Sequence, residues 1–260
     1  MNKIELENLQ LKTFTEQDTI DYCLLNNINP DNIKELYLQN NKLTDISGIK
    51  IFKNLKLLYL HYNQLTDISD LKYLTKRKEL YLNNNKITDI SVLQYLNNLE
   101  YLKIESNKIK DISGIKNVNK LEVFLAADNL ISDISELKNL QKLILLDIRS
   151  NELTDISAVK NLINLKHLNI TNNKIINISV LKDLINLKHL YMGYNKITDI
   201  SVLQYLNNLK YLSINDLRLE SDQIQYIQSL KNLNTLYKAR GFKNQSSALK
   251  ELNKNSILLK

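Results

Sequence analysis

The sequence predicts an α/β fold: a right-handed solenoid with an inner parallel β-sheet, a convex side of short 3₁₀ or irregular turns, and helical caps at its ends. The first indication is an asparagine that recurs every 22 residues. These asparagines are Asn41, Asn63, Asn85, Asn107, Asn129, Asn151, Asn173 and Asn195. A second series with the same step, Asp45 to Asp199, is followed each time by Ile-Ser. Leucines that alternate with other residues before each asparagine are the third indication, and such a fixed period is typical of stacked repeats.

Residues 1–32 do not fit the period, and we expect them to form an N-terminal cap. Thr15 to Asn27 is predicted to be a short helix with Thr15 as its N-cap residue. Ile20, Cys23 and Leu24 lie on one side of that helix and are expected to cover the first repeat. Cys23 is then a small buried hydrophobic residue rather than a reactive thiol.

Eight regular repeats fill residues 33–208 without a gap, and we expect the same course in each. In the L-x-L segment the leucines alternate, so this segment is predicted to be a short strand with one buried face. Because 22 residues leave no room for a full helix on the return side, the D-I-S-x-L-x-x-L segment is predicted to form 3₁₀-like turns. The aspartate should accept backbone N–H groups just after it, and Asn177 keeps that capability. The repeated asparagine should satisfy backbone groups that the bending strand leaves unpaired.

The last repeats are less regular. Residues 209–242 form an irregular ninth repeat and a half repeat, and residues 243–260 are predicted to be a C-terminal cap, with helical segments at Asp222–Leu230 and Ser246–Asn253. We expect about nine to ten parallel strands in all. Arg77 occupies a position that is leucine or isoleucine in the other regular repeats. Its side chain should therefore extend to the surface or find a carboxylate.

The repeat L-x-x-L-x-L-x-x-N-x-L, which covers most of the chain, resembles the leucine-rich repeat signature. Its 22-residue length and its D-I-S-x-L element resemble the SDS22-like class, which the bacterial internalins also use. The resemblance implies a binding function, because many such proteins are phosphatase regulators or bacterial adhesion or effector proteins.

The exposed strand positions line the predicted concave face, and they hold the candidate binding residues. Tyrosine dominates them, and it is a large, rigid side chain common at protein interfaces. The first cluster is Tyr37, Tyr59, His61, Tyr62, Tyr81 and Tyr101. The second cluster is His167, His189, Tyr191, Tyr194 and Tyr211, with Tyr237 as a further candidate. Between them lie Val123, Leu125, Leu145, Asp147 and Arg149.

A structural interpretation of the tyrosines stays open. They could stack on their neighbours and stiffen the sheet. In addition, residues 86–102 and 196–212 match at sixteen of seventeen positions with an offset of 110 residues, or five repeats. Tyr101 and Tyr211 can therefore recur through duplication rather than through selection for binding.

Charge on the predicted concave face is opposite to the net charge of +7. Six acidic residues lie there against Lys103 and Arg149, while most lysines lie at the strand entrances and on the return side. A nucleic-acid groove needs the reverse arrangement, because phosphate contacts supply much of the affinity. We therefore expect no nucleic acid, and a partner whose apolar residues are ringed by lysine or arginine.

Catalytic and metal-binding patterns are missing from the sequence. It has one cysteine, and no phosphate-binding loop or metalloprotease motif. His167 and His189 occupy the same position in adjacent repeats, but a metal would need a third ligand. We expect no catalytic residue, no metal and no cofactor.

The sequence thus predicts a non-enzymatic protein-binding module or scaffold that recognises a protein or peptide on its concave face. We expect a monomeric, cytoplasmic chain without membrane contact, since no apolar stretch is long enough for a membrane span and the acidic first residues do not resemble a signal peptide. Two alternatives remain. One is a structural or membrane-surface-associated spacer that uses the lysine-rich outer surface. The other is a secreted effector or adhesion-like protein exported without a recognisable signal peptide.

Overall fold

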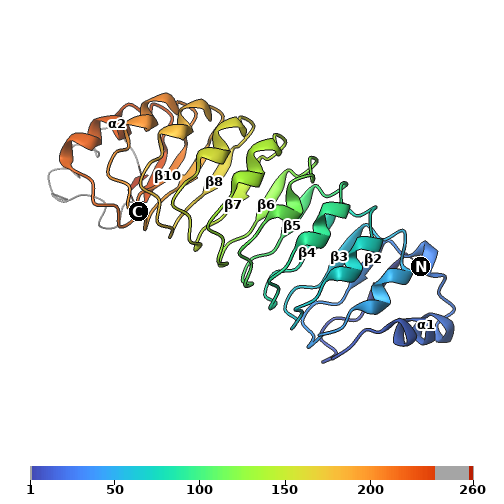
Figure 1. Ribbon diagram of the computed structural model, residues 1–260. Helices are drawn as coiled ribbons and strands as arrows, with labels where there is room; N and C mark the ends of the chain where they lie inside the picture. Colours follow the sequence, from blue (N-terminus) through green and yellow to red (C-terminus); the bar gives the residue numbers. More distant parts are fainter. Residues whose placement is uncertain (1, 238–257, 260) are drawn as a thin grey trace. The chain divides into compact units, whose positions relative to one another are not determined.

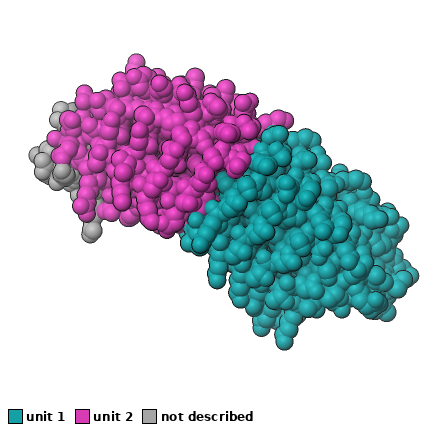
Figure 2. Space-filling model, viewed as in Figure 1, with its two compact units in different colours: residues 1–130 teal, residues 131–260 magenta. Residues whose placement is uncertain are grey.

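The computed structural model describes residues 2–237 and 258–259. The chain divides into two compact units, residues 1–130 and residues 131–260 (Figure 2). In each unit short parallel strands lie side by side, and 3₁₀ helices line the opposite, return side (Figure 1). Both units are right-handed leucine-rich-repeat solenoids, so the predicted fold class is confirmed.

The first unit has six described strands, which pair in parallel in chain order. They are β1 (Lys3–Glu5), β2 (Glu35–Tyr37), β3 (Leu57–Tyr59), β4 (Glu79–Tyr81), β5 (Tyr101–Lys103) and β6 (Val123–Leu125). Its 3₁₀ helices are η1 (Pro30–Asn32), η2 (Ser47–Ile51), η3 (Ser69–Tyr73), η4 (Ser91–Tyr95) and η5 (Ser113–Ile115). From β2 onward the register advances by one repeat per strand, so that Leu36, Leu58 and Leu80 stack in the core without solvent exposure.

The second unit continues the pattern with six described strands. They are β7 (Leu145–Asp147), β8 (His167–Asn169), β9 (His189–Tyr191), β10 (Tyr211–Ser213), β11 (Thr235–Tyr237) and β12 (Leu258–Leu259). Its helices are η6 (Ser135–Asn139), η7 (Ser157–Asn161), η8 (Ser179–Asp183), η9 (Ser201–Tyr205), η10 (Ser221–Gln223) and α2 (Ile224–Gln228). Helix is thus short within the repeats, as the 22-residue length predicts.

Both units contain a strand that the period did not predict. In β1, Ile4 is buried and pairs with Leu36 of β2. This strand was missed because Leu9 stands where the later repeats have their asparagine. In the second unit, β12 pairs with β11 from within the predicted C-terminal cap. The predicted helix at Ser246–Asn253 lies outside the described residues.

The asparagine series has the predicted structural role. The Asn63 side chain donates to the carbonyl oxygens of Leu60 (3.0 Å) and Leu38 (2.9 Å), one in its own repeat and one in the repeat before. Its amide oxygen accepts from the backbone N–H of Leu43 at 3.0 Å. Each asparagine of this kind therefore joins two adjacent repeats through groups that the bending strand cannot pair.

The aspartate series begins the return side. Asp67 accepts the backbone N–H of Ser69 at 2.8 Å, two residues further on, just as η3 starts. Asn177 makes the equivalent bond to Ser179 at 2.8 Å, so the exception in the series keeps its function. Both series are confirmed as elements of the fold.

The N-terminal helix forms, but its buried side differs from the prediction. Helix α1 spans Glu16–Leu25, and Thr15 caps it in a reciprocal pair with Asp18. Thr19 and Cys23 are buried, whereas Ile20 is 37% exposed and Leu24 is 71% exposed. The expectation that Ile20 and Leu24 pack on the repeats is therefore wrong, while burial of Cys23 is confirmed.

The reason for this rotation of α1 is a close polar contact rather than an apolar one. A Cβ atom placed on Gly48 of η2 would lie 2.0 Å from the Thr19 hydroxyl oxygen and 2.5 Å from the Thr15 carbonyl oxygen. Only glycine leaves room for the helix backbone at this distance. The helix side that carries Thr19 and Cys23 therefore faces η2.

The two predicted fates of Arg77 are both wrong. Its side chain is completely buried, and all three guanidinium nitrogens lack a hydrogen-bond partner. Burial lowers its pKa to about 9, so the group stays charged at neutral pH. The short spacing of the repeats leaves Arg77 in the leucine column, between Leu55 and Leu99, with no route to the surface.

The irregular ninth repeat is helical over much of the predicted segment. Where Asp222–Leu230 was expected, η10 and α2 follow one another and bury Ile224 and Ile227. None of the helices in the part of the chain that the structure describes is both long enough and apolar enough to cross a membrane.

Candidate protein-binding surface

The predicted concave positions lie, in each unit, on the exposed side of the strands, which we name the strand face. In the first unit its centre is a stack of three tyrosine rings at one position of three successive strands. The ring centroids of Tyr37 and Tyr59 are 4.8 Å apart, and those of Tyr59 and Tyr81 are 4.4 Å apart. Tyr101 extends the stack, with its ring centroid 5.0 Å from that of Tyr81. The rings use their faces on one another, so the structural interpretation of this column has direct support.

Two acidic residues hold the hydroxyl ends of this stack. The Tyr37 hydroxyl donates to Glu35 at 2.9 Å, and the Tyr81 hydroxyl donates to Glu79 at 2.9 Å. Burial and the neighbouring Glu35 raise the pKa of Tyr37 to about 12, and burial with Glu79 raises the pKa of Tyr81 further. The phenols therefore stay neutral donors, and the stack presents rigid ring edges to solvent.

His61 lies beside the stack with unsatisfied polar capacity. Its ring meets the Tyr59 ring edge-on at 6.1 Å and the Tyr62 ring at 5.5 Å. Burial, and then the charge of Lys103, lower the pKa of His61, so the imidazole is neutral at pH 7. Its Nδ1 atom is buried and has no hydrogen-bond partner.

Two more unpaired oxygens lie in the two turns of the chain that precede His61. Gln39 Oε1 and Glu7 Oε2 are buried without a partner, and their residues occupy the same strand position as His61. Gln39 was among the predicted exposed positions, but Glu7 was missed because β1 was missed. The alternation of Lys3, Ile4 and Glu5 was the signal that could have found it.

Tyr62 and Tyr194 differ from the stacked tyrosines. They are 53% and 50% exposed, respectively, and each has a positive φ of 55°. The same position in the other regular repeats has the same left-handed backbone but holds asparagine, serine or aspartate. Asparagine and aspartate tolerate this conformation, whereas a bulky side chain there is unusual.

The second unit holds a stack of different composition. The His167 and His189 rings are 4.2 Å apart, and the His189 and Tyr211 rings are 4.4 Å apart. Burial lowers the pKa of both histidines, and adjacent lysines lower it further. Tyr191 lies half-buried on the same strand face, and burial raises its pKa.

The remaining predicted residues are less available. Asp147 is buried, and its carboxylate forms an ion pair with Arg149, so neither is a bare charge. Leu125 and Val123 lie half-buried on β6 of the first unit, and Leu145 lies half-buried on β7 of the second. Gly193 was predicted to be exposed but is buried, and a Cβ atom there would lie 2.7 Å from the carbonyl oxygen of Asn215.

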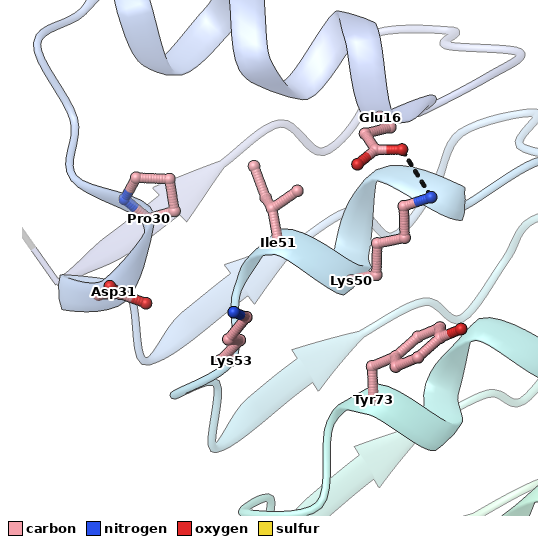
Figure 3. Close-up of a pocket in the computed structure, with 7 residues that line it drawn as sticks. All are labelled: Glu16, Pro30, Asp31, Lys50, Ile51, Lys53 and Tyr73. Carbon is pink, nitrogen blue, oxygen red and sulfur yellow. Dashed lines mark ion pairs between the residues drawn. The ribbon is translucent and has the colours of Figure 1, made fainter.

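A pocket of about 460 Å³ lies on the return side of the first unit, away from the strand face. Figure 3 shows Lys50 of η2 reaching Glu16 of α1, an ion pair of 2.6 Å, with the Tyr73 ring on the far side. Pro30 and Ile51 contribute apolar surface. This pocket is a seam between the cap and the first repeats. Among the described residues, no group of three potential metal ligands occurs.

The repeats and their strand face define a leucine-rich repeat protein. The family model described as leucine rich repeats (2 copies) matches residues 31–73, 78–117, 163–205 and 185–224, more than half of the chain. The chain therefore belongs to the leucine-rich repeat family, and it is of internalin type. No match was found among curated proteins.

Solved structures agree with this assignment. An internalin (inlF) of Listeria monocytogenes is 33% identical with a TM-score of 0.73, and the alignment covers 88% of this chain and 73% of that one. A leucine-rich repeat protein of Leptospira interrogans is 22% identical with a TM-score of 0.70, covering 100% and 84%. The ectodomain of the Arabidopsis thaliana receptor kinase GASSHO1/SCHENGEN3, solved with CASPARIAN STRIP INTEGRITY FACTOR 2, is 20% identical with a TM-score of 0.72, covering 93% and 32%. The last two show the fold alone. This fold commonly serves protein–protein interaction.

Proposed function

We propose that this protein is a non-enzymatic binding module that holds a protein or peptide on the strand face of its first unit, around Tyr62. The observation that carries the proposal is the exposed Tyr62 side chain on a left-handed backbone. A non-glycine residue in that conformation costs roughly 1–2 kcal/mol, and the other repeats reduce the cost with small polar residues. A costly local conformation with no stabilising contact of its own is typical of a functional position.

The surroundings of Tyr62 are suited to a partner. The tyrosine stack is already rigid, so little side-chain entropy is lost when a partner docks. The unpaired His61 Nδ1 and Gln39 Oε1 lie next to it and would gain hydrogen bonds from a partner. Buried polar groups without partners are rare, so three of them in one strand column favour a ligand there.

Charge indicates the kind of partner. Glu7, Glu35 and Glu79 lie on this strand face and form no ion pair within the described residues, whereas Lys103 is paired with Glu105 at 3.2 Å. Apolar or aromatic residues ringed by lysine or arginine would complement the surface. The plant receptor ectodomain, solved in complex with CASPARIAN STRIP INTEGRITY FACTOR 2, is an example of the same fold with a bound partner. The SDS22-like class, a monomeric state and a cytoplasmic location belong to this proposal and rest on the repeat length and composition.

The test separates binding from stability at one residue. A photo-crosslinking phenylalanine analogue at position 62 should capture a partner from cells of the source organism, and the same analogue at Lys116 on the return side should not. With the captured partner purified, Tyr62→Asn should weaken binding at least about tenfold. The same change should leave the melting temperature unchanged or raise it, because asparagine suits the left-handed backbone.

A different result would contradict the proposal. If Tyr62→Asn binds normally while glutamate at Lys116 and Lys138 abolishes binding, the return side is the functional surface. That outcome would favour the spacer that uses its lysine-rich outside. The matched control is Asn84→Tyr in the Tyr62→Asn background. It places a tyrosine at the same position one repeat further on, and it should not restore binding.

A further inference from the structure

We propose that the second unit carries a separate binding site for an acidic peptide segment, formed by Lys166, Lys188 and Lys210 together with the edges of His167, His189 and Tyr211. This site differs from the surface around Tyr62 in unit, in residues and in charge. It does not depend on the function proposed above.

The three lysines form an uninterrupted cationic column. Their backbones are joined strand to strand, with Lys188 N–H donating to the Lys166 carbonyl at 2.9 Å and Lys210 N–H to the Lys188 carbonyl at 2.8 Å. Neighbouring strands lie about 4.8 Å apart, so the three side chains leave one edge of the sheet close together. All three are exposed, and none forms an ion pair or side-chain hydrogen bond within the described residues.

The same column in the first unit is different. There Lys78 pairs with Glu100 of the next repeat at 2.7 Å, and Glu122 follows. Alternation of sign cancels the charge within the column. In the second unit no acidic residue interrupts the lysines, so the column has a positive potential that a bound anion would neutralise.

The ring stack adjoins this column and limits what the anion can be. His189 lies between His167 and Tyr211, so both of its ring faces are covered. Leu145 and Thr235 are the register neighbours at the two ends of the stack. No ring face is free to stack on a base, and stacking supplies much of the affinity for single-stranded nucleic acid. Ring edges beside ammonium groups instead suit carboxylates, which accept N–H donors from both.

A bound carboxylate would also change the histidines. The charged groups that face them are Lys166, Lys188 and Lys210, since Asp147 on β7 is already paired with Arg149. These lysines and burial hold the imidazoles neutral at pH 7. A carboxylate between lysine and imidazole would favour the imidazolium form and raise the histidine pKa. Peptide binding is then coupled to proton uptake, and affinity rises as the pH falls through the histidine range.

The test uses the whole chain and a fluorescent peptide of alternating glutamate and serine. Fluorescence anisotropy should show saturable binding that weakens at least about tenfold in Lys188→Gln/Lys210→Gln. The matched control is Lys160→Gln/Lys182→Gln, which removes two exposed lysines from the return side of the same unit and should bind normally. Circular dichroism should show that both variants remain folded.

The pH readout distinguishes this site from general charge attraction. Binding should tighten several-fold between about pH 7.5 and about pH 5.5, where glutamate stays ionised. In His167→Gln/His189→Gln the peptide should still bind at the higher pH, but the pH dependence should flatten. Equal losses in the lysine variants of both sides, or no peptide binding at all, would overturn the proposal. So would tighter, Lys188-dependent binding of oligothymidylate or of phosphatidylserine vesicles, because the site would then serve nucleic acid or a membrane. Tyr62→Asn should leave every one of these results unchanged.

Discussion

Arg77 is a charged side chain that the fold leaves without compensation. It is completely buried, and its nitrogens have no partner. Arg77→Leu should stabilise the protein by about 1–4 kcal/mol, because it replaces a buried, unpaired charge with the residue found in the same column elsewhere. Chemical unfolding in urea, read as a shift of the midpoint, measures the change.

Two controls accompany that variant. Arg77→Lys keeps the charge and should not stabilise, and Arg218→Leu removes an exposed arginine and should change stability by less than about 0.5 kcal/mol. If Arg77→Leu destabilises by more than about 1 kcal/mol, the guanidinium has a partner and a role of its own.

Asn129 is a contrasting residue whose polar atoms are all in use. It donates to Ile104 at 3.0 Å and accepts from Ile109 at 3.0 Å. Asn129→Ala should cost about 1–3 kcal/mol, because backbone groups of two repeats lose their partner. Lys116→Ala, on the exposed return side, should change stability by less than about 0.5 kcal/mol. Equal shifts of the two urea midpoints would contradict the structural role of the asparagine series.

At the scale of elements, the contact between α1 and η2 depends on Gly48. Gly48→Ala should destabilise by about 1–3 kcal/mol, because the new methyl group would overlap Thr19 and the backbone of Thr15. Glu136→Ala is the matched control, since Glu136 occupies the same repeat position where no helix covers it. Thermal unfolding followed by circular dichroism compares them, and a silent Gly48→Ala would show that α1 does not rest on η2.

The elements show what sequence can and cannot determine. Strands, 3₁₀ turns and both polar series followed from the period, because each depends on residues that recur at fixed positions. Strand β1 did not follow, since Leu9 replaces the asparagine that marks a repeat. The orientation of α1 also did not follow, because the contact of Thr19 with Gly48 is polar and close, and apolar pattern alone favoured Ile20 and Leu24.

The candidate surfaces were only partly predictable for a similar reason. The period places Tyr59 and His189 on a strand face, but it cannot show that their rings stack on neighbours. The left-handed backbone at Tyr62 and Tyr194, which separates them from the stacked rings, is a property of the bend and not of the residue type. The burial of Asp147 and its pairing with Arg149 likewise depend on side-chain conformation.

At the scale of the whole molecule, the repeat length is the unit of change. Excision of residues 99–120 joins Asn98 to Leu121 and keeps every later residue at its place in the repeat. The variant should keep the circular dichroism spectrum of the parent per residue and unfold cooperatively, with stability lowered by one repeat and one interface. Excision of residues 99–119 shifts the register and should give a poorly folded chain. Similar behaviour of the two deletions would show that the polar series are not obligatory.

The hydrogen bonds of Asn63, which reach one repeat back and no further, have a consequence for ancestry. No residue in such an array needs to recognise how many copies precede it, so recombination between misaligned copies of the gene can add or remove whole repeats without harm to the rest. The near-identity of residues 86–102 and 196–212, five repeats apart, is the trace that such an exchange leaves. Selection can then act on the length of the array and, independently, on the few side chains that each new copy exposes.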